Sequence, residues 1–211
     1  MMILNILIAF TLLISSSYAN TLAFDYCVGD PTLPHGPSGY SCKDPRRVTT
    51  NDFAYSGLRT PSNTSNALKY GVSYAIDKQF PALTGMGISM ARNDIDVGGV
   101  VPLHSHRTAE LAILIKGTIV AGFIDTNNKP FYKTLNEGDI FVFPPALEHF
   151  QFNVGNVPVV AYAAFPSSNP GFQGISSALF KNNLPTDIIQ KISLLDVAQI
   201  KKLKAVFGGT N

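Results

Sequence analysis

The chain has 211 residues, of which 45% are hydrophobic and 14% charged, and its formal net charge at pH 7 is +2. It has no basic stripe and no Arg-rich run, which excludes the usual electrostatic footprint of a nucleic-acid-binding protein. A surface so poor in charge favours a protein that buries part of that surface in an oligomer.

The first residues are typical of a secretory signal peptide. An apolar run, Ile3–Ile14, precedes small polar residues, and Ser17-x-Ala19 is a plausible cleavage site, so residues 1–19 are predicted to be removed after Ala19. The run is short for a bilayer span, which takes roughly 20 residues. An uncleaved anchor is the alternative, because no Lys or Arg precedes Lys43. The protein is therefore expected to be extracellular, with no membrane attachment after cleavage.

About 190 residues remain, which suits one domain with a sizeable core. Residues 20–53 are predicted to form an N-terminal extension closed by a Cys27–Cys42 disulfide, because an even cysteine count in a secreted chain favours pairing. Such a bridge would stabilise the Pro- and Gly-rich loop by about 3 kcal/mol. Asn63-Thr64-Ser65 is an N-glycosylation acceptor, which places Asn63 on the surface.

The middle of the chain has the pattern of a β-protein. Short strands are predicted at Gly85–Met90, Leu111–Ile115, Thr118–Ile124, Phe131–Leu135, Ile140–Phe143, His149–Val154 and Val157–Phe165. Lys116-Gly117 looks like a tight hairpin between two of them. After Pro170 the spacing becomes helical, over 176–182, 186–192 and 196–206. The predicted fold is all-β, a sandwich or barrel, with a short helical C-terminal tail, over residues 54–205.

Three of the four histidines belong to one pattern, His104-Ser105-His106, then Glu110, then His149. Imidazoles and a carboxylate are a mixed ligand set for a first-row divalent metal. Residues two apart on a strand share a face, and Glu110 has the same parity, so a metal site on the inner face of a sheet is predicted. The alternative is that these histidines are structural, since H-x-H also occurs by chance.

Two longer segments carry a family resemblance. Residues 98–110, with Gly117 after them, resemble the first motif of the cupin superfamily, and residues 138–153 resemble the second. The chain also resembles plant germin-like proteins, especially the branch that contains auxin-binding-protein-like germins. This resemblance rests on the cysteine pair, on residues 63–66 and on residues 79–83. The resemblance implies a single cupin jelly-roll barrel whose His104, His106, Glu110 and His149 hold manganese, or another divalent first-row metal. It also implies a homohexamer clasped by C-terminal helices, in the plant cell wall or apoplast.

Three positions depart from the family in ways that bear on the site. Ala146 occupies a position where glycine is usual, in a turn for which a positive φ is expected. Ala91 and Val101 stand where oxalate-oxidising germins have asparagines that contact the substrate. Neither side chain can donate a hydrogen bond, so oxalate oxidase activity is not expected.

The resulting functional hypothesis is an extracellular manganese protein, a superoxide dismutase in the most favoured form, with a possible role in defence. One alternative is a binding protein for a small apolar acid such as an auxin, with a lining of Phe141, Phe143, Phe150, Phe152, Met86 and Met90, although such residues more often form plain core. A wall protein that acts through its stable hexamer, and a non-redox cupin enzyme acting on a plant metabolite, also remain open.

Overall fold

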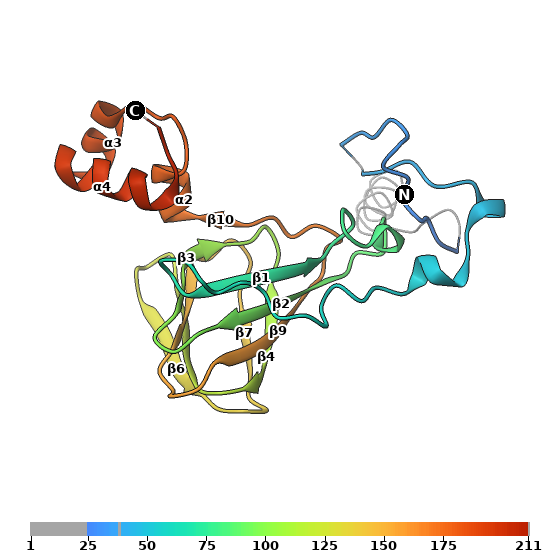
Figure 1. The fold of residues 1–211 in the computed structure, drawn as a ribbon, viewed down its shortest axis with the longest axis horizontal. Helices are drawn as coiled ribbons and strands as arrows, with labels where there is room; N and C mark the ends of the chain where they lie inside the picture. The colour runs from blue at the N-terminus through green and yellow to red at the C-terminus, as the bar shows by residue number, and fades with distance from the viewer. Residues whose placement is uncertain (1–24, 38, 211) are drawn as a thin grey trace, which may run out of the picture.

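The computed structural model describes residues 25–37 and 39–210, and two β-sheets packed face to face form its body (Figure 1). The predicted signal peptide, residues 1–19, lies outside the described residues. The N-terminal extension and the C-terminal helices flank the same end of the sheets, on opposite sides of it (Figure 1). Within the described residues, no helix is long and apolar enough to cross a bilayer.

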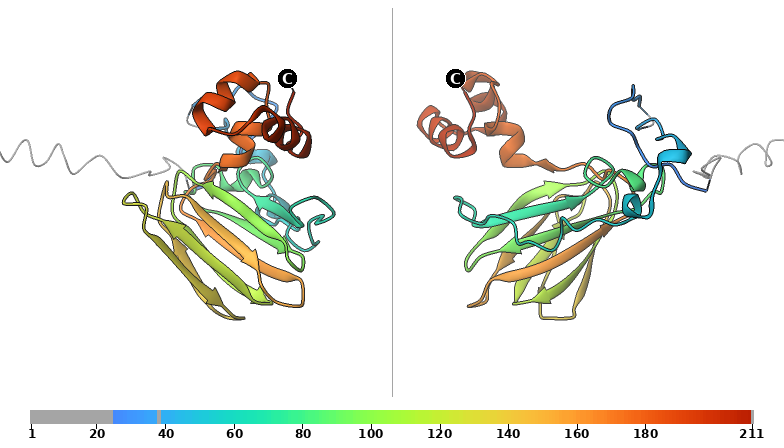
Figure 2. Two further views of the ribbon diagram at one scale, coloured as in Figure 1. Left: turned by 90° about the vertical axis from the view of Figure 1, so that its left-hand side faces the viewer. Right: turned by 45° about the vertical axis from the view of Figure 1, so that its right-hand side comes forward.

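The first sheet has the strand order β1-β2-β9-β4-β7, and the second β10-β3-β8-β5-β6, with all neighbours antiparallel. This is the predicted jelly-roll, in which strands close in sequence alternate between two layers (Figure 2). The strands are β1 Tyr70–Ala75, β2 Ser89–Ile95, β3 Val100–Ser105, β4 Glu110–Lys116, β5 Ile119–Ile124, β6 Pro130–Leu135, β7 Ile140–Phe143, β8 His149–Asn153, β9 Val159–Phe165 and β10 Gln173–Gly174.

The core lies between the two sheets and follows from alternation along the strands. In β9, residues 159, 161, 163 and 165 are buried, and those between them are not. The main cluster gathers apolar side chains from both layers: Ile95, Val101, Leu114, Ile119, Ala121, Leu135, Phe143, Val159 and Ala161. This packing holds the two sheets at a fixed separation and so fixes the positions of side chains that meet between them.

The predicted hairpin at Lys116-Gly117 is wrong. β4 pairs with β7 and β9, whereas β5 pairs with β6 and β8, so the two strands belong to different sheets. Gly117 carries the chain across with φ +92°, and a Cβ there would lie 2.7 Å from the Val159 side chain. Glycine is thus required for a crossover between layers, not for a two-residue turn.

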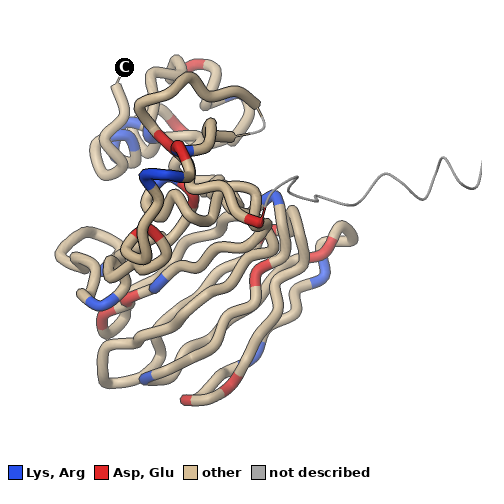
Figure 3. The backbone as a smooth tube through the Cα atoms, turned by 90° about the vertical axis from the view of Figure 1, so that its right-hand side faces the viewer, with Lys and Arg blue, Asp and Glu red and all other residues tan. Residues whose placement is uncertain are grey.

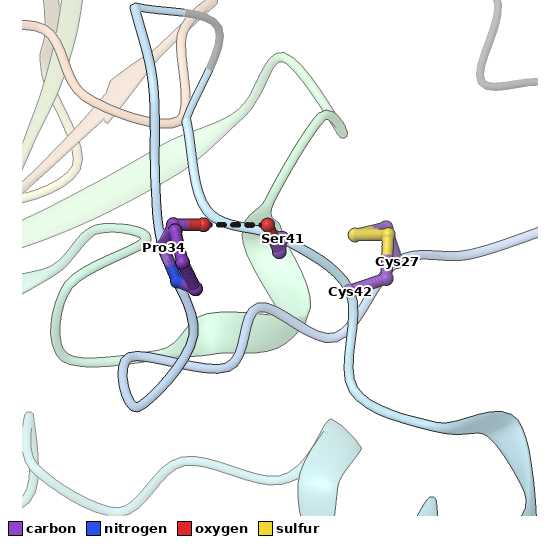
Figure 4. Close-up of a disulfide and its surroundings, with 4 residues drawn as sticks. All are labelled: Cys27, Pro34, Ser41 and Cys42. Atoms are coloured by element: carbon purple, nitrogen blue, oxygen red, sulfur yellow. Dashed lines mark hydrogen bonds between the residues drawn. A yellow bond between two sulfur atoms is a disulfide. The ribbon is translucent and has the colours of Figure 1, made fainter.

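The N-terminal extension is closed by the predicted disulfide, with a Cα–Cα distance of 5.1 Å between Cys27 and Cys42 (Figure 4). Ser41 Oγ donates a hydrogen bond of 2.6 Å to the carbonyl of Pro34 within the same loop. Two short 3-10 helices follow, η1 Pro45–Arg47 and η2 Thr50–Phe53, and a third, η3 Pro81–Leu83, precedes β2. A Lys43–Asp52 ion pair of 2.8 Å joins the loop to η2.

Three helices form a small unit with its own apolar centre: α2 Ile175–Phe180, α3 Thr186–Ser193 and α4 Val197–Phe207. Phe180, Ile189 and Ile200 are buried against one another. A capping box between Asp196 and Gln199 starts α4. This confirms the predicted helical tail.

One lysine of α4 differs from expectation. Lysine side chains are almost never fully buried unless they are paired, but Lys204 is only 3% exposed. Its ammonium donates to the carbonyls of Leu184 and Thr210 at 2.6 Å each, and to that of Asn182 at 3.4 Å. The charge is buried because three carbonyl oxygens replace its water.

Candidate metal centre

The structure brings the four predicted ligand residues together. His104 on β3 lies directly opposite His149 on β8, His106 follows the end of β3, and Glu110 begins β4 in the other sheet. All four side chains are buried, and one ligand atom from each lies within 4.8 Å of the others. His106 Nε2 is 3.1 Å and His149 Nε2 is 3.3 Å from the same carboxylate oxygen of Glu110.

Glu110 meets the histidines from the opposite sheet, and not along a shared strand as the sequence predicted. Glu110 is not on the strand of the histidines, so its shared parity with them has no structural meaning. The chain leaves β3 at Ser105, crosses to the opposite sheet, and presents the carboxylate from there. The centre therefore lies between the two sheets and is held by both, which a single-sheet site would not be.

Each imidazole is oriented by a backbone carbonyl on its far side. His104 Nδ1 is 2.8 Å from the carbonyl of Pro102, and His149 Nδ1 is 2.8 Å from that of Leu147. His106 Nδ1 contacts the carbonyl of Gly171. Because a carbonyl can only accept, all three Nδ1 atoms must carry a proton. The neutral tautomer then leaves a lone pair on each Nε2, as metal-bound histidines require.

These lone pairs meet a buried carboxylate. Burial alone would raise the pKa of Glu110, but hydrogen bonds from His106 and His149, which require protonated Nε2 atoms, lower it to about 2. Burial and the adjacent His149 lower the pKa of His104 to about 3, which keeps that ring neutral. The Nδ1 protons are already donated to backbone carbonyls. The Glu110 carboxylate therefore needs either protonated Nε2 atoms on His106 and His149 or a metal cation as its partner. A divalent cation meets this need for all four residues at once.

Aromatic rings enclose the histidines. Phe143 stacks on His149 with centroids 4.6 Å apart, and Phe165 meets His106 edge-on at 4.9 Å. Phe172, on the segment that leads to β10, stacks on His104 at 4.6 Å. Sequence analysis did not find Phe172 or Gly171, because no local pattern shows that this segment folds back onto the site.

A cavity of about 20 Å³ adjoins the ligands. Its walls include Ala91 and Val101, both buried, so the two apolar replacements do face the candidate centre. A water-sized group needs about 10–15 Å³ by this measure, so the space holds one or two such groups. Of the apolar lining proposed for an auxin, Met86, Met90 and Phe152 are instead exposed.

Comparison with known proteins agrees with this geometry. The sequence profile of the Cupin family matches residues 56–201. The chain is 52% identical to "Auxin-binding protein ABP19a" of Prunus persica, over 100% of both chains. It is 48% identical to "Germin-like protein subfamily 3 member 3" of Arabidopsis thaliana, over 100% of this chain and 99% of that one. The chain belongs to the germin-like proteins of the cupin family.

A solved structure of oxalate oxidase matches this germin-like protein with a TM-score of 0.84 and 30% identity, over 90% of this chain and 98% of that one. The match extends well beyond the barrel, which alone would give little information about the chemistry.

Ala146 and Asn63 lie as the sequence predicts, and Asn153 orders the backbone around it. Ala146 has φ +61°, so the turn does require a left-handed residue, and its N–H donates to the carbonyl of His106 at 2.9 Å. Asn153 is buried and its amide nitrogen lies within 3.1 Å of three carbonyls, of Ile95, Asp96 and Val157, which is a structural role. Asn63 is exposed, as a glycosylation acceptor must be.

Proposed function

We propose that this germin-like protein is a secreted manganese protein of the plant cell wall and apoplast that dismutes superoxide. The observation that supports the proposal best is the convergence of three Nε2 lone pairs and one carboxylate beside a cavity of about 20 Å³. His104, His106, Glu110 and His149 would hold the ion.

The donor set fits a divalent ion with open positions. Three neutral imidazoles and one carboxylate would leave a net single positive charge, which attracts small anions. Manganese favours six ligands and the protein offers four, so two positions would face the cavity. Open positions are the mark of a reactive rather than a structural metal site.

When bound, manganese would supply one-electron redox chemistry, by which two superoxide ions and two protons become one dioxygen and one hydrogen peroxide. The chain's own residues position the ligands and limit what can approach. Phe143, Phe165 and Phe172 keep bulk water from the imidazoles, and the carbonyls of Pro102, Leu147 and Gly171 hold each ring in place. Such outer contacts typically contribute 10- to 100-fold to metal affinity.

Oxalate fits this site poorly. The dianion is larger than the cavity beside the ligands, and the side chains of Ala91 and Val101 offer it no donor. We therefore expect the purified, manganese-loaded protein to release no hydrogen peroxide from oxalate. Substantial peroxide release would show that other groups bind the substrate.

Metal analysis joined to a superoxide dismutase assay on the secreted protein tests the proposal. We expect about one manganese per chain, and loss of both metal and activity in His104→Ala and His149→Ala. Arg59→Ala is the matched control, because Arg59 is exposed and its side chain contacts nothing in the site. Protein purified without chelators that holds less than about a tenth of an ion per chain would exclude the redox role.

The outer face of the first sheet supports the expected homo-oligomer. Met90, Ala164, Leu111 and Val142 form one cross-strand row over four strands, and all are exposed. Charged residues are sparse on the strands (Figure 3). A monomer rarely leaves such an apolar face in water. Leu111→Lys is expected to lower the mass measured by sedimentation, whereas Tyr132→Lys, on an exposed β6 side chain, should not.

The C-terminal helices offer a second apolar surface for assembly. Ile188, Ile192 and Leu194 of the α3 region are 41%, 61% and 90% exposed, which fits a clasp onto a neighbouring subunit. A homohexamer would use both surfaces. The signal peptide 1–19, the extension 20–53, the barrel unit 54–205, glycosylation of Asn63 and a role in defence remain predictions. Mass spectrometry of the secreted protein would test the new N-terminus and the glycan together.

One observation favours a second candidate, a binding protein for an apolar acid. A hollow of about 660 Å³ lies outside the barrel and is almost wholly apolar; it is lined by Tyr55, Leu83, Ile88, Met90 and Leu111, among others. The buried Ser89 hydroxyl in its wall finds no hydrogen-bond partner among the residues that the structure describes. This volume suits a small organic ligand, and several relatives are named auxin-binding proteins. Saturable calorimetric binding of an auxin that survives metal removal and is lost in Ala164→Phe would support it.

A further inference from the structure

The wall of the metal cavity contains an unexpected tyrosine. Tyr74 of β1 lines the same 20 Å³ space as His104, His106 and Glu110. It faces inward, because Val72 and Tyr74 both pack against the buried cluster of Ala91, Ala163 and Phe165. In the β1–β2 pairing Tyr74 lies directly opposite Ala91, so the two side chains share a face and the large ring lies beside the small one.

The Tyr74 phenol is a free hydrogen-bond donor. Its backbone carbonyl accepts from the Tyr55 hydroxyl at 3.1 Å, but none of the described residues bonds to the Tyr74 hydroxyl itself. Burial, together with Tyr70 and Glu110, raises the pKa of Tyr74 to about 12, so the proton stays on the oxygen at any physiological pH. The hydroxyl is therefore available to donate to a ligand or a water molecule in the cavity.

The charge of Glu110 distinguishes Tyr74 from the other tyrosine of the wall. Glu110 acts electrostatically on Tyr74, whereas burial alone accounts for the raised pKa of Tyr70, which packs against the main core cluster. The remaining polar groups of the wall are the amides of Asn93 and Gln151. Because Ala91 and Val101 offer no donor, the hydroxyl donors of the wall are Tyr70 and Tyr74, and Tyr74 is the one whose pKa responds to Glu110.

We propose that Tyr74 positions a small anion at the metal centre by donating a hydrogen bond to it from the β1 wall. The proposal rests on the proposed function, because it requires an ion on the four ligands. The cavity volume limits the anion to one or two water-sized groups, which includes superoxide and excludes dicarboxylates. Tyr74 is a ligand-positioning residue in this account, and it does not hold the metal.

Azide, a small monoanion, is a suitable probe. Its dissociation constant would be measured by calorimetry on manganese-loaded wild type, Tyr74→Phe and Tyr132→Phe, with metal content and thermal unfolding recorded for each. Tyr132 is the control, because it is 68% exposed on β6. We expect Tyr74→Phe to retain its manganese and its fold and to bind azide about tenfold more weakly, as loss of one hydrogen bond to a charged group implies. Tyr132→Phe should match wild type.

The outcomes separate the two claims. Unchanged azide affinity in a folded, manganese-loaded Tyr74→Phe protein overturns the role of Tyr74 and leaves the metal site intact. Loss of manganese from Tyr74→Phe also overturns it, because the residue would then support the ligands and not the anion. A wild-type protein that takes up no manganese overturns the proposed function, and this inference with it.

Discussion

Ala146 is the residue whose replacement tests most directly how the His106 loop is built. It has φ +61° and is exposed, so its methyl group packs against little, while its N–H still bonds to the His106 carbonyl. A left-handed conformation costs an L-residue roughly 1–2 kcal/mol, and glycine avoids this cost. Glycine also raises the conformational entropy of the unfolded chain, which offsets about 0.4–1 kcal/mol of this gain in stability. Ala146→Gly should therefore stabilise the protein by about 0.5–1 kcal/mol.

The measurement is urea unfolding followed by circular dichroism, since the chain has no tryptophan to report by fluorescence. In thermal unfolding of a chain of this size, the added 0.5–1 kcal/mol of stability corresponds to a rise in Tm of roughly 1–4 °C. Ala205→Gly is the matched control: Ala205 is also exposed but lies within α4, where glycine should cost about 1 kcal/mol. If both variants lose the same stability, the left-handed strain at Ala146 is not real and the argument fails.

Three other predictions concern the segment between β9 and β10, the unit of three C-terminal helices, and the dependence of stability on pH. Gly171→Ala should weaken manganese binding about tenfold, as measured by competition with a chelator. Gly171 has φ +69°, and a Cβ there would crowd Arg107 and shift the carbonyl that orients His106. Gly208→Ala is the control and should bind manganese normally, because Gly208 has φ +80° but open space around it. Lys204→Met should speed amide exchange in 175–207, because its carbonyl partners lose their donor, whereas the exposed Lys201→Met should not. The metal-free protein should lose stability as the pH falls from about 6.5 to about 3 in chemical unfolding, because the lowered pKa of His104 makes the unfolded state bind its proton first. Glu110, whose pKa is lowered to about 2, adds a loss of the same sign below about 4.5, and a flat profile would contradict both.

Local patterns predicted most of the strands and all three helices, because alternation and capping residues are short-range signals. They could not say which sheet a strand joins. β4 and β5 follow one another across Lys116-Gly117 as a hairpin would, yet each pairs elsewhere. That choice depends on which apolar faces pack together between the layers, and alternation is the same in either arrangement.

The four candidate ligands could be found from their residue types and from the resemblance, but their surroundings could not. Glu110 meets the histidines from the opposite sheet, and Gly171 reaches His106 from 65 residues further along the chain. Lys204 illustrates the same limit: its charge indicated a solvated face, and only the fold supplies the carbonyls that bury it. Contacts between backbone carbonyls and distant side chains leave no trace in sequence spacing.

The positions of the four ligands imply that metal binding and folding are coupled in this protein. His104 and His149 belong to one sheet, Glu110 to the other, and His106 is oriented by the segment that leads to the C-terminal helices. An ion on these residues would join both layers and that segment at one point, so its binding free energy would stabilise the whole arrangement. The same segment carries Phe172 over His104 and continues into helices whose apolar side chains are exposed. Assembly through those helices would therefore hold the segment against the centre, and the oligomer and the metal site would stabilise each other.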